Sequence, residues 1–395
     1  MMKNIDLVIL AGGKGTRIKH LEKKVPKALI KFGKFSVLEY LLMHYSKFKF
    51  ERIFIISGHL GNQIYKKFNN KEYNLSKIKV ILENKLKGTG GSLYELKNKI
   101  NNDFVLINGD TFFLFDLNNF INFSIAQKTQ ITVALTKNKN YFTNTKLVNL
   151  KLKKNLLYFS KTKNKLMNGG AYYIKGNFLN NVKKKYMSLE HEIDKLIIKK
   201  KVSGIIFNNF FLDIGTVSNY KIAQNKIPKL FFKPAAFLDR DGVINEDSGY
   251  VSKFEKFKFR KNVIKGLKYL KSKDYYIFIV TNQAGIAKNI FSINQFYELQ
   301  KKVHIYLSEQ NFSFDDVIYC PYHIKAKLKK FKKNSSLRKP NDGMIKILIK
   351  RYNVNMDKSF VIGDQKKDFK MANKMRLKFA YAEDDFYSLV KKLTK

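Results

Sequence analysis

Short apolar runs of β type alternate along this chain with segments of helical periodicity, and they do so in two separate series. The first series predicts strands at Ile5–Leu10, Arg52–Ser57, Lys79–Leu82, Asp103–Ile107 and Gln130–Leu135, and helices at Val37–Tyr45, Gly61–Phe68 and Ser92–Lys99. The second predicts strands at Ala235–Leu238, Tyr276–Val280 and Ser359–Ile362, and helices at Val263–Lys271, after Ser292 and at Gly343–Tyr352. Because strands that alternate with helices form mostly parallel sheets, we expect an α/β protein with two domains, each a mainly parallel sheet flanked by helices.

The two series meet at Lys226–Pro234, where two prolines bracket an apolar KLFFK and no periodicity survives. A chain of 395 residues is too long for one ordinary domain of about 100–200 residues, and its 45% of apolar residues can fill two cores. We therefore predict a first domain at 1–228, a linker at 229–234 and a second domain at 235–395.

A net charge of +46 comes from 77 basic and 31 acidic residues. Only seven of the basic residues are Arg, and the Lys residues are spread along the whole chain. Since Arg is the residue that recognises phosphates and guanine edges in fixed geometry, this distribution favours small anionic substrates and a solvated surface over a nucleic-acid partner. A polyanion-binding protein on a degenerate enzyme scaffold is the alternative from another class.

Three further features indicate the compartment. Cys320 is the single cysteine, so no internal disulfide can form, and it cannot build a zinc site by itself. No apolar stretch reaches the roughly 18–20 residues that a membrane-spanning helix needs, and the N-terminal apolar run is too short for a signal peptide. We expect a cytoplasmic protein without a membrane partner, and the sequence leaves a homo-oligomer open.

A glycine-rich turn, LAGGKGTR at Leu10–Arg17, follows the first predicted strand. At the C-terminal end of a strand in an open α/β sheet, such a turn lets backbone N–H groups approach phosphates, and Lys14 and Arg17 would add positive charge. By itself the turn is as often only a tight connection. Further motifs in the same half are Pro26-Lys27, Gly88–Ser92 (GTGGS), Asp110 in NGD, Asn168–Ile174, Ser188–Glu192 and Phe211–Thr216.

These motifs, in this order, resemble those of the sugar-phosphate nucleotidyltransferases over Ile5–Asn225. The resemblance implies a Rossmann-like fold and an in-line attack of a sugar 1-phosphate on the α-phosphate of a nucleoside triphosphate, which requires alignment and charge neutralisation. Arg17 and Lys27 would then hold the triphosphate, and Asp110 and Asp213 would bind Mg²⁺. The nucleotide or the sugar would contact Leu10, Ala11, Gly12, Gly13, Gly88, Asn108, Lys161, Gly170 and Glu190.

Three of these assignments have structural alternatives. Asp110 could simply begin a turn, and Glu190 could serve only to stabilise the dipole of the helix in whose first turn it stands. The family often has Glu-Lys before the NGG motif, whereas this chain has Phe159-Ser160-Lys161, so Lys161 is one of many lysines that could take the role.

The second series begins with an apolar strand that leads directly into Asp239 and Asp241. In extended backbone, residues two apart point the same way, so we expect both carboxylates at one site. One can attack phosphorus while the other, protonated, donates to the leaving oxygen, and a divalent cation lowers the repulsion between the anions. The motif TNQAGIA follows the next strand, and RKPNDGM with Lys339 and FVIGDQKKD with Asp364 come later.

These four motifs resemble the haloacid-dehalogenase (HAD) phosphatases, and GVINEDSGYV, TNQAGIA, the YCP turn and RKPNDGM are similar to D-glycero-D-manno-heptose 1,7-bisphosphate 7-phosphatases from Ala235 to the end. The resemblance implies a HAD-like fold, with Asp239 as nucleophile and Asp241 as general acid and base. Asp239, the backbone carbonyl of Asp241 and Asp364 would bind Mg²⁺. Substrate would contact Asp247, Ser248, Gly249, Tyr250, Thr281, Asn282, Gln283, Arg338 and Lys339. Histidinol phosphatases share much of this pattern.

Phosphatases of this family also have a structural zinc loop, C-x-H followed by C-x-C. Here Cys320 is present, but Tyr322 stands at the His position, with His323 displaced by one, and Ser335 and Leu337 stand at the two later Cys positions. A closed zinc site needs four N or S ligands, and this loop offers at most two. We therefore expect no zinc, and a loop held by other contacts.

The two resemblances together predict a bifunctional enzyme that uses Mg²⁺ at both sites. Its C-terminal domain would remove the 7-phosphate of a heptose bisphosphate, and its N-terminal domain would couple the heptose 1-phosphate to a nucleotide. The nucleotidyltransferases that use this heptose phosphate in its α form resemble guanylyltransferases, so GTP is the first choice of nucleotide and GDP-heptose the expected product. Nothing in Gly12–Arg17 or Gly88–Ser92 specifies guanine. The alternative enzyme is a nucleotidyltransferase for a hexose 1-phosphate, such as that of mannose or glucose, fused to a histidinol-phosphate-like phosphatase.

Overall fold

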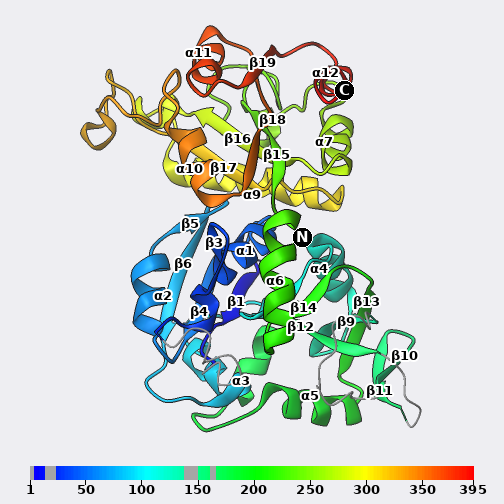
Figure 1. Ribbon diagram of the computed structural model, residues 1–395. Coiled ribbons are helices and arrows are strands. Elements are labelled where there is room, and N and C mark those ends of the chain that lie inside the picture. The colour runs from blue at the N-terminus through cyan, green and yellow to red at the C-terminus, as the bar shows by residue number, and fades with distance from the viewer. Residues whose placement is uncertain (1–3, 14–23, 138–149, 161–165) are drawn as a thin grey trace. The chain divides into compact units, whose positions relative to one another are not determined.

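The computed structural model describes residues 4–13, 24–137, 150–160 and 166–395 of the chain (Figure 1). The chain divides into two compact units. The first consists of Met1–Tyr45 and Phe50–Pro228, and the second of Ser46–Lys49 and Lys229–Lys395. Each unit has its own sheet with helices of its own, as the two series of strands and helices in the sequence predict.

A ten-stranded sheet forms the centre of the first unit, in the order β10-β11-β13-β9-β12-β7-β1-β4-β6-β5. Its strands are β1 (Asp6–Leu10), β4 (Arg52–Ser57), β5 (Glu72–Tyr73), β6 (Ser76–Leu82), β7 (Phe104–Asn108), β9 (Ile131–Thr136), β10 (Leu150–Lys153), β11 (Leu156–Phe159), β12 (Met167–Ile174) and β13 (Val202–Phe207). The pairings give seven strands one direction (β1, β4, β6, β7, β9, β10, β13) and three the other (β5, β11, β12). The predicted class, a mainly parallel α/β sheet, is therefore confirmed.

Helices flank this sheet, and two short antiparallel ribbons complete the unit. The helices are α1 (Val37–Tyr45), α2 (Gly61–Phe68), α3 (Gly88–Gly91), α4 (Leu117–Ala126), α5 (Leu189–Ile198) and α6 (Val217–Leu230). The ribbons pair β2 (Lys31–Phe32) with β3 (Phe35–Ser36), and β8 (Thr111–Phe113) with β14 (Phe211–Asp213). Helix α5 begins where the Ser188 hydroxyl accepts a hydrogen bond from the N–H of His191 at 3.3 Å, and its buried Leu189 and Ile193 join the core of the sheet.

Two predicted segments differ in the structure. The helix expected at Ser92–Lys99 is a 3₁₀ helix over Ser92–Leu96. The irregular segment expected at Lys226–Pro234 is mostly regular, because α6 continues through Pro228 to Leu230 and the first strand of the second unit begins at Lys233. Pro228 lies in the last turn of its helix, and Pro234 stands beside a register shift in its strand, which is a position where a sheet tolerates proline.

The second unit has a five-stranded, fully parallel sheet in the order β17-β16-β15-β18-β19. The strands are β15 (Lys233–Leu238), β16 (Tyr276–Asn282), β17 (Asp316–Cys320), β18 (Val354–Gly363) and β19 (Lys378–Tyr381). The helices are α7 (Val263–Ser272), α8 (Ala284–Ala287), α9 (Ile293–Glu309), α10 (Gly343–Arg351), α11 (Lys366–Lys374) and α12 (Phe386–Leu393). The predicted cap of α9 is confirmed, since Ser292 and Gln295 form a reciprocal capping box.

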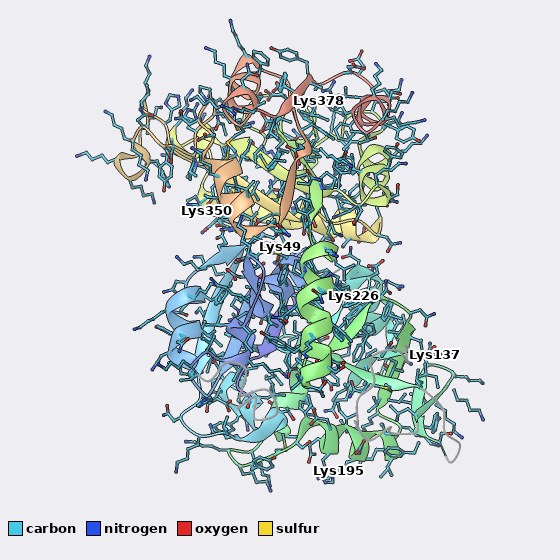
Figure 2. The ribbon with its side chains drawn as sticks, in the orientation of Figure 1. Lys49, Lys137, Lys195, Lys226, Lys350 and Lys378 are labelled. Carbon is cyan, nitrogen blue, oxygen red and sulfur yellow. The ribbon has the colours of Figure 1, made fainter. Side chains whose placement is uncertain are left out.

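The lysines are distributed over the elements of both units. Figure 2 labels, among others, Lys137 after β9, Lys195 on α5, Lys226 on α6, Lys350 on α10 and Lys378 on β19. The basic residues of the described chain are thus carried by many separate elements. None of the helices in the described ranges has the length and apolar character needed to cross a membrane.

Candidate active sites

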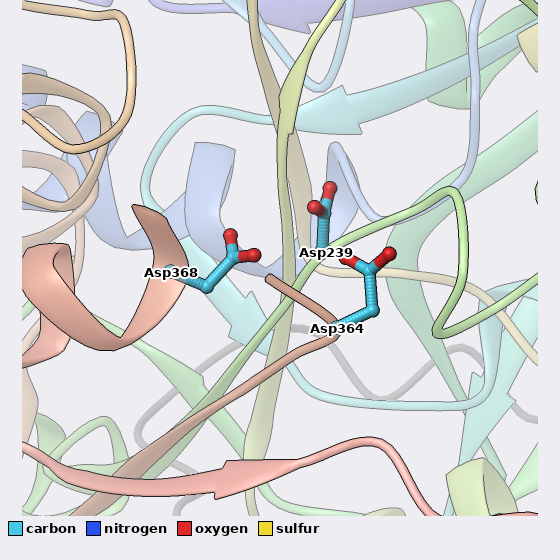
Figure 3. Close-up of side chains that lie close together, drawn as sticks. All are labelled: Asp239, Asp364 and Asp368. Atoms are coloured by element: carbon cyan, nitrogen blue, oxygen red, sulfur yellow. The ribbon is translucent and has the colours of Figure 1, made fainter. Parts of the chain in front are cut away.

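Three carboxylates gather at the C-terminal edge of the second unit's sheet (Figure 3). Asp239 follows β15, Asp364 follows the neighbouring strand β18, and Asp368 lies in the first turn of α11. One oxygen of each carboxylate lies within 4.8 Å of the other two. Parallel strands bring their carboxyl ends to one edge of the sheet, which is why residues far apart in the chain meet here.

A buried lysine balances part of this negative charge. Lys339 Nζ lies 2.7 Å from an Asp239 oxygen and 2.6 Å from an Asp368 oxygen. Burial disfavours the charged lysine, but the two carboxylates outweigh burial and raise the pKa of Lys339. Asn282 fixes the backbone of Lys339, because its Oδ1 accepts from the Lys339 N–H at 3.1 Å and its Nδ2 donates to the Lys339 carbonyl at 3.3 Å.

Asp239 has the surroundings of an ionised nucleophile in a dry site. Burial raises the pKa of Asp239 to about 6, although Lys339 acts in the opposite direction. At neutral pH the carboxylate form still dominates, and that is the form that attacks phosphorus. The N–H of Arg240 donates to Asp239 Oδ1 at 2.7 Å, and Lys339 contacts Oδ2, so both oxygens are held.

Two glycines make room for these carboxylates. Gly242 has a φ of +81°, and a Cβ there would come within 2.5 Å of Asp364 Oδ2. A Cβ on Gly363 would overlap the side chain of Asp368. A larger residue at either position would displace a carboxylate of the cluster.

The Asp241 carboxylate is held by several hydrogen bonds, and its sharing of one site with Asp239 stays a prediction. Its carboxylate accepts from Arg240 Nη2 at 2.8 and 2.9 Å, from Gln283 Nε2 at 3.0 Å and from Asn245 Nδ2 at 3.0 Å, and it does not belong to the three-acid cluster. The predicted Gln283 is thereby brought to Asp241.

The three-acid cluster fits a divalent cation. Asp364 Oδ1 is buried and has no hydrogen-bond partner among the residues that the structure describes, although buried polar atoms are normally satisfied. Hard divalent cations prefer carboxylate oxygens. Asp239, Asp364 and Asp368 are thus the side chains that would hold the cation, which would lower the repulsion between the nucleophile and a phosphate. Both phosphatases of this type and nucleotidyltransferases use divalent metals.

The predicted substrate residues occupy three segments around the cluster. Asp247, Ser248, Gly249 and Tyr250 form an exposed turn in which Asp247 Oδ1 accepts from the Gly249 N–H at 3.0 Å. Lys288 Nζ donates to the Tyr250 hydroxyl at 2.7 Å. Thr281 is buried at the end of β16 and accepts from Gln283 Nε2 at 2.9 Å. Arg338 directly precedes Lys339 and donates to the Tyr322 carbonyl at 3.3 Å.

The loop after Cys320, where the sequence predicts no zinc, has contacts of its own. The Lys333 ammonium lies 3.8 Å from the centre of the Tyr322 ring, and the Ser335 hydroxyl accepts from the Leu337 N–H at 3.2 Å. Cys320 is buried, and its Sγ lies 3.8 Å from the Tyr322 carbonyl oxygen. Among the described residues, no group of three His, Cys, Asp or Glu side chains gathers at this loop.

The first unit contains a cavity of about 350 Å³ at the C-terminal ends of its parallel strands, a size that suits a small-molecule ligand. Eight predicted residues line it: Leu10, Ala11, Gly12, Gly13, Lys27, Gly88, Asn108 and Asp110. The predicted Lys14, Arg17 and Lys161 lie outside the described residues.

The predicted metal acids of this unit lie at one end of the β8/β14 ribbon. In this ribbon Asp213 pairs with Thr111, the residue after Asp110, and the Ile214 N–H donates to the Asp110 carbonyl at 3.1 Å. Lys27 Nζ lies 2.6 Å from Asp110 Oδ2. Asp213 Oδ1 accepts from the Gly215 N–H at 2.7 Å. The ribbon thus places Asp213 next to the backbone of Asp110, whose carboxylate pairs with Lys27, and a metal there is still a prediction.

The GTGGS segment has a packing role in addition to lining the cavity. Gly88 has a φ of +75°, and a Cβ there would come within 2.6 Å of the Met187 carbonyl oxygen. The N–H groups of Gly90 and Gly91 donate to that same carbonyl at 2.9 and 3.1 Å. These two backbone donors are therefore used for packing against the segment before α5.

Gly170 and Glu190 each lie one contact away from the cavity lining. A Cβ on Gly170 would come within 2.7 Å of Asn108 Nδ2, so the two residues are in close contact. The Glu190 carboxylate accepts from the Thr89 hydroxyl at 2.8 Å and from the Ser188 hydroxyl at 2.7 Å. Glu190 also stands in the first turn of α5, as its structural alternative requires.

Two acids of these sites were missed by the sequence prediction. Asp368 stands in the first turn of α11, whereas Asp364 precedes the cap of that helix, so helical spacing does not link the two acids in the sequence. Glu83 follows β6, lines the cavity, and its Oε1 is buried without a hydrogen-bond partner among the described residues. Burial raises the pKa of Glu83. No local motif marks Glu83, because only the sheet places it beside Gly12.

Comparison with known proteins identifies a family for each of the two parts of the chain. Residues 7–229, more than half of the chain, match the family model described as nucleotidyl transferase, and residues 235–389 match the one described as polynucleotide kinase 3 phosphatase. The chain is 40% identical over 139 residues to the D-glycero-beta-D-manno-heptose-1,7-bisphosphate 7-phosphatase of Photorhabdus laumondii, covering 35% of this chain and 74% of that protein. It is 40% identical over 136 residues to the protein of the same name from Haemophilus influenzae, covering 34% and 73%.

Among solved structures, HddC from Yersinia pseudotuberculosis is similar with a TM-score of 0.47 and 23% identity, over 56% of this chain and 99% of HddC. The inositol-1-phosphate CTP transferase from T. maritima is similar with a TM-score of 0.48 and 16% identity, over 58% of this chain and 98% of that one. The chain is an enzyme with two activities: through residues 7–229 it belongs to the nucleotidyl transferase family, and through its C-terminal part it belongs to the D-glycero-D-manno-heptose-1,7-bisphosphate 7-phosphatases.

Proposed function

We propose that this chain dephosphorylates D-glycero-D-manno-heptose 1,7-bisphosphate at position 7 and transfers GMP from GTP to the resulting heptose 1-phosphate, giving GDP-heptose and pyrophosphate. Residues 235–395 carry the first reaction and residues 1–228 the second. Both need Mg²⁺, and the partners are these small molecules, with no nucleic acid and no membrane, in the cytoplasm. The observation that supports the proposal best is the buried Asp239–Lys339–Asp368 group beside Asp364, in a segment with heptose bisphosphatase relatives.

In the phosphatase reaction, the Asp239 carboxylate attacks phosphorus while the bond from phosphorus to the sugar oxygen breaks. Asp241 donates a proton to that oxygen and later accepts one from the water that hydrolyses the aspartyl phosphate. Lys339 keeps Asp239 ionised and oriented, since its ammonium contacts the attacking carboxylate. Asp241 would first have to exchange its contacts with Arg240 and Gln283 for a contact with the substrate.

In the transfer reaction, the sugar phosphate oxygen attacks the α-phosphate of the triphosphate and pyrophosphate leaves on the opposite side. The protein has no covalent step to supply, so alignment and charge neutralisation decide the rate. Lys27 offers a cation in the cavity beside Asp110. Arg17, from the glycine-rich motif Leu10–Arg17, is the second cation proposed for the triphosphate. Gly170 and Glu190, the residues proposed for the sugar, contact Asn108 and Thr89, which line the same cavity.

Glu83 supports guanine as the base. Its carboxylate is in the cavity and presents only acceptors when ionised. Guanine offers two adjacent donors, N1–H and the N2 amino group, whereas adenine presents an acceptor at N1. A carboxylate can therefore accept both hydrogen bonds from guanine, whereas it repels the N1 acceptor of adenine. None of the glycine motifs provides this discrimination between the bases.

The deciding experiment incubates the full chain with Mg²⁺, GTP and heptose 1,7-bisphosphate of each anomer, and identifies the products by mass spectrometry. We expect heptose 1-phosphate first and GDP-heptose and pyrophosphate afterwards. Parallel reactions replace GTP by ATP, CTP or UTP, and the heptose by mannose 1-phosphate, glucose 1-phosphate or histidinol phosphate. Turnover of these alternatives at a higher rate than the heptose substrates would contradict the proposal.

A further inference from the structure

A second cavity of the first unit has no part in the reactions described above. Its volume is about 520 Å³, and its lining shares no residue with the cavity that contains Lys27 and Asp110. A cavity of this size accepts a small molecule. Its lining comes from β4, from β6, from α2 with the turn after it, and from the residues that follow the 3₁₀ helix Ser92–Leu96.

The cavity lies at the outer edge of β6, beside α2 (Figure 1). Strand β5 pairs only with the first two residues of β6, so in the described chain no strand covers the rest of that edge. The turn after α2 satisfies the exposed backbone instead. Asn69 Oδ1 accepts from the Val80 N–H at 3.0 Å, and the Asn70 N–H donates to the Ile78 carbonyl at 3.0 Å. The edge is therefore closed to another strand, and the two asparagines stand in the lining of the cavity.

Three cations line this cavity, and none of its lining residues is an acid. Lys79 is exposed on β6 and forms no ion pair within the described ranges. The Lys99 ammonium donates to the Glu95 carbonyl at 2.8 Å, which is a neutral acceptor. Arg52 pairs with the buried Asp6 at 2.7 Å, and Asp6 does not line the cavity. The lining thus has a net positive charge, which attracts an anionic ligand.

An aromatic ring and amides in the same lining select more than a bare anion. The Tyr65 side chain on α2 is 42% exposed, so its ring is available to a flat group of the ligand. Asn70 and Asn98 are exposed, and each offers an amide donor and an acceptor. Inorganic phosphate would use only the cations. A nucleoside phosphate would use the cations for its phosphates, the ring for stacking of its base and the amides for the polar edges of the base and ribose.

We propose that this cavity is a second nucleotide site, in which Lys79 and Lys99 bind the phosphates of a nucleoside diphosphate and Tyr65 stacks on its base. The site is separate from the catalytic cavity and does not depend on the sugar or the base proposed above. Two elements connect the cavities. Ser92 lines the catalytic cavity and begins the 3₁₀ helix that leads to Asn98, and β6 leads to Glu83.

The test uses the absence of tryptophan from the sequence, because Tyr65→Trp then supplies a single fluorescent reporter in the proposed site. GDP and ADP are titrated into the full chain with this substitution, since a base that stacks on the indole quenches its fluorescence. Guanosine and inorganic phosphate are titrated separately as the two halves of the ligand. Tyr186→Trp, at a position that lines the catalytic cavity, reports binding there in a second protein.

Lys79→Glu and Lys77→Glu, each combined with Tyr65→Trp, are the matched pair of variants. Both lysines are exposed on β6, but only Lys79 lines the cavity, so the two variants change the net charge equally. We expect GDP and ADP to quench the reporter saturably. Lys79→Glu should raise the Kd about tenfold or more and Lys77→Glu less than about twofold, because only Lys79 donates to the phosphates. Guanosine and phosphate should each bind at least about tenfold more weakly than GDP. An unchanged Tm reports that each variant is folded.

Three outcomes would overturn the inference. If neither nucleotide quenches the Tyr65→Trp reporter saturably at millimolar concentration, the cavity does not bind nucleotides. If Lys79→Glu and Lys77→Glu change the Kd equally, only the overall charge of the chain attracts the nucleotide. If inorganic phosphate binds as tightly as GDP, the base is not recognised. None of these outcomes bears on the catalytic cavity, whose occupancy the Tyr186→Trp protein reports separately.

Discussion

The ammonium of Lys339 lies 2.7 Å from the Asp239 carboxylate, and less than a tenth of either side chain is exposed. Asp368 contacts the same ammonium at 2.6 Å, so one cation serves two buried carboxylates, and the nearby Asp364 adds a third acid. The group therefore has an excess of negative charge, which a divalent cation would offset. Its parts also depend on one another for stability, because removing the lysine leaves buried acids without a partner.

Lys339→Met should destabilise the second unit by about 3–5 kcal/mol in metal-free protein, since it breaks a buried ion pair and strands two carboxylates. Chemical denaturation followed by a signal from that unit measures the change. Lys346→Met is the control: Lys346 pairs with Asp342 on an exposed helix surface, and its loss should cost less than about 1 kcal/mol. Equal losses in the two variants would mean that the buried group is not a linked unit.

Asp239→Asn should abolish release of phosphate from heptose 1,7-bisphosphate, because an amide cannot form the aspartyl phosphate. Transfer of GMP to heptose 1-phosphate that is supplied ready-made should be nearly unchanged, since Asp239 and the cavity of Asp110 belong to separate sheets. Asp110→Asn is the reciprocal variant and should lower transfer about 100-fold or more while phosphate release persists. A folded Asp239→Asn protein that lost both activities would contradict the assignment of one activity to each part.

The positions that sequence predicted well are those fixed by the ends of strands. Asp239, Asp364 and Asp110 follow strands that the apolar runs predict, because a polar residue after such a run stands at the carboxyl end of a parallel strand. Their chemical roles stay predictions. Strands β10 to β14 were not predicted, and they include antiparallel pairings whose register depends on residues far away. The hydrophobic pattern of a short segment does not indicate which distant strand it pairs with.

The details that sequence could not give all depend on contacts between distant residues. The partners of the Asp241 carboxylate include Gln283, which stands 42 residues later in the chain and which no local pattern links to it. Glu83 gains its place only because β6 lies two strands from β1 in the sheet. The role of the glycines at Gly88–Gly91 likewise depends on the Met187 carbonyl, nearly 100 residues away in the chain.

Glu83→Gln should reduce the preference for GTP over ATP about tenfold or more in kcat/KM, because the amide offers one acceptor instead of two to the donors of guanine. Competition between the two nucleotides in one reaction, with both nucleotide sugars quantified by mass, measures the ratio directly. Glu192→Gln is a control for the loss of one acid, since Glu192 pairs with Lys195 on the surface of α5. An unchanged ratio in Glu83→Gln would remove Glu83 from base recognition.

The lowered pKa of His304 implies that the stability of the second unit depends on pH. Burial on α9 lowers the pKa of His304 to about 3, whereas an unfolded histidine titrates near its ordinary value of 6.5. Between these values the unfolded chain binds the extra proton, so stability is lost as pH falls below about 6.5. Asp239, with its raised pKa, acts in the opposite direction over part of this range, so a difference between variants is needed.

The variant His304→Gln removes the titrating group and keeps a side chain of similar size. From pH 7.5 to pH 4.5 the wild type should lose about 2–3 kcal/mol of unfolding free energy relative to this variant, as about 1.4 kcal/mol per pH unit below 6.5 implies. Denaturation curves at the two pH values give the number. Parallel behaviour of the two proteins would mean that His304 is protonated in the folded state.

Zinc should be absent from the loop that begins at Cys320. Burial raises the pKa of the Cys320 thiol, so it stays protonated near neutral pH, whereas zinc binds the thiolate. Tyr322 takes part in a cation–π contact with Lys333, and Ser335 accepts from the Leu337 N–H, so the positions of the lost ligands already have structural roles. Protein purified without chelator should contain well below one zinc per chain, and a zinc-selective chelator should leave its Tm unchanged. Stoichiometric zinc, or a lower Tm after chelation, would mean that Cys320 and His323 acquire further ligands from elsewhere in the chain.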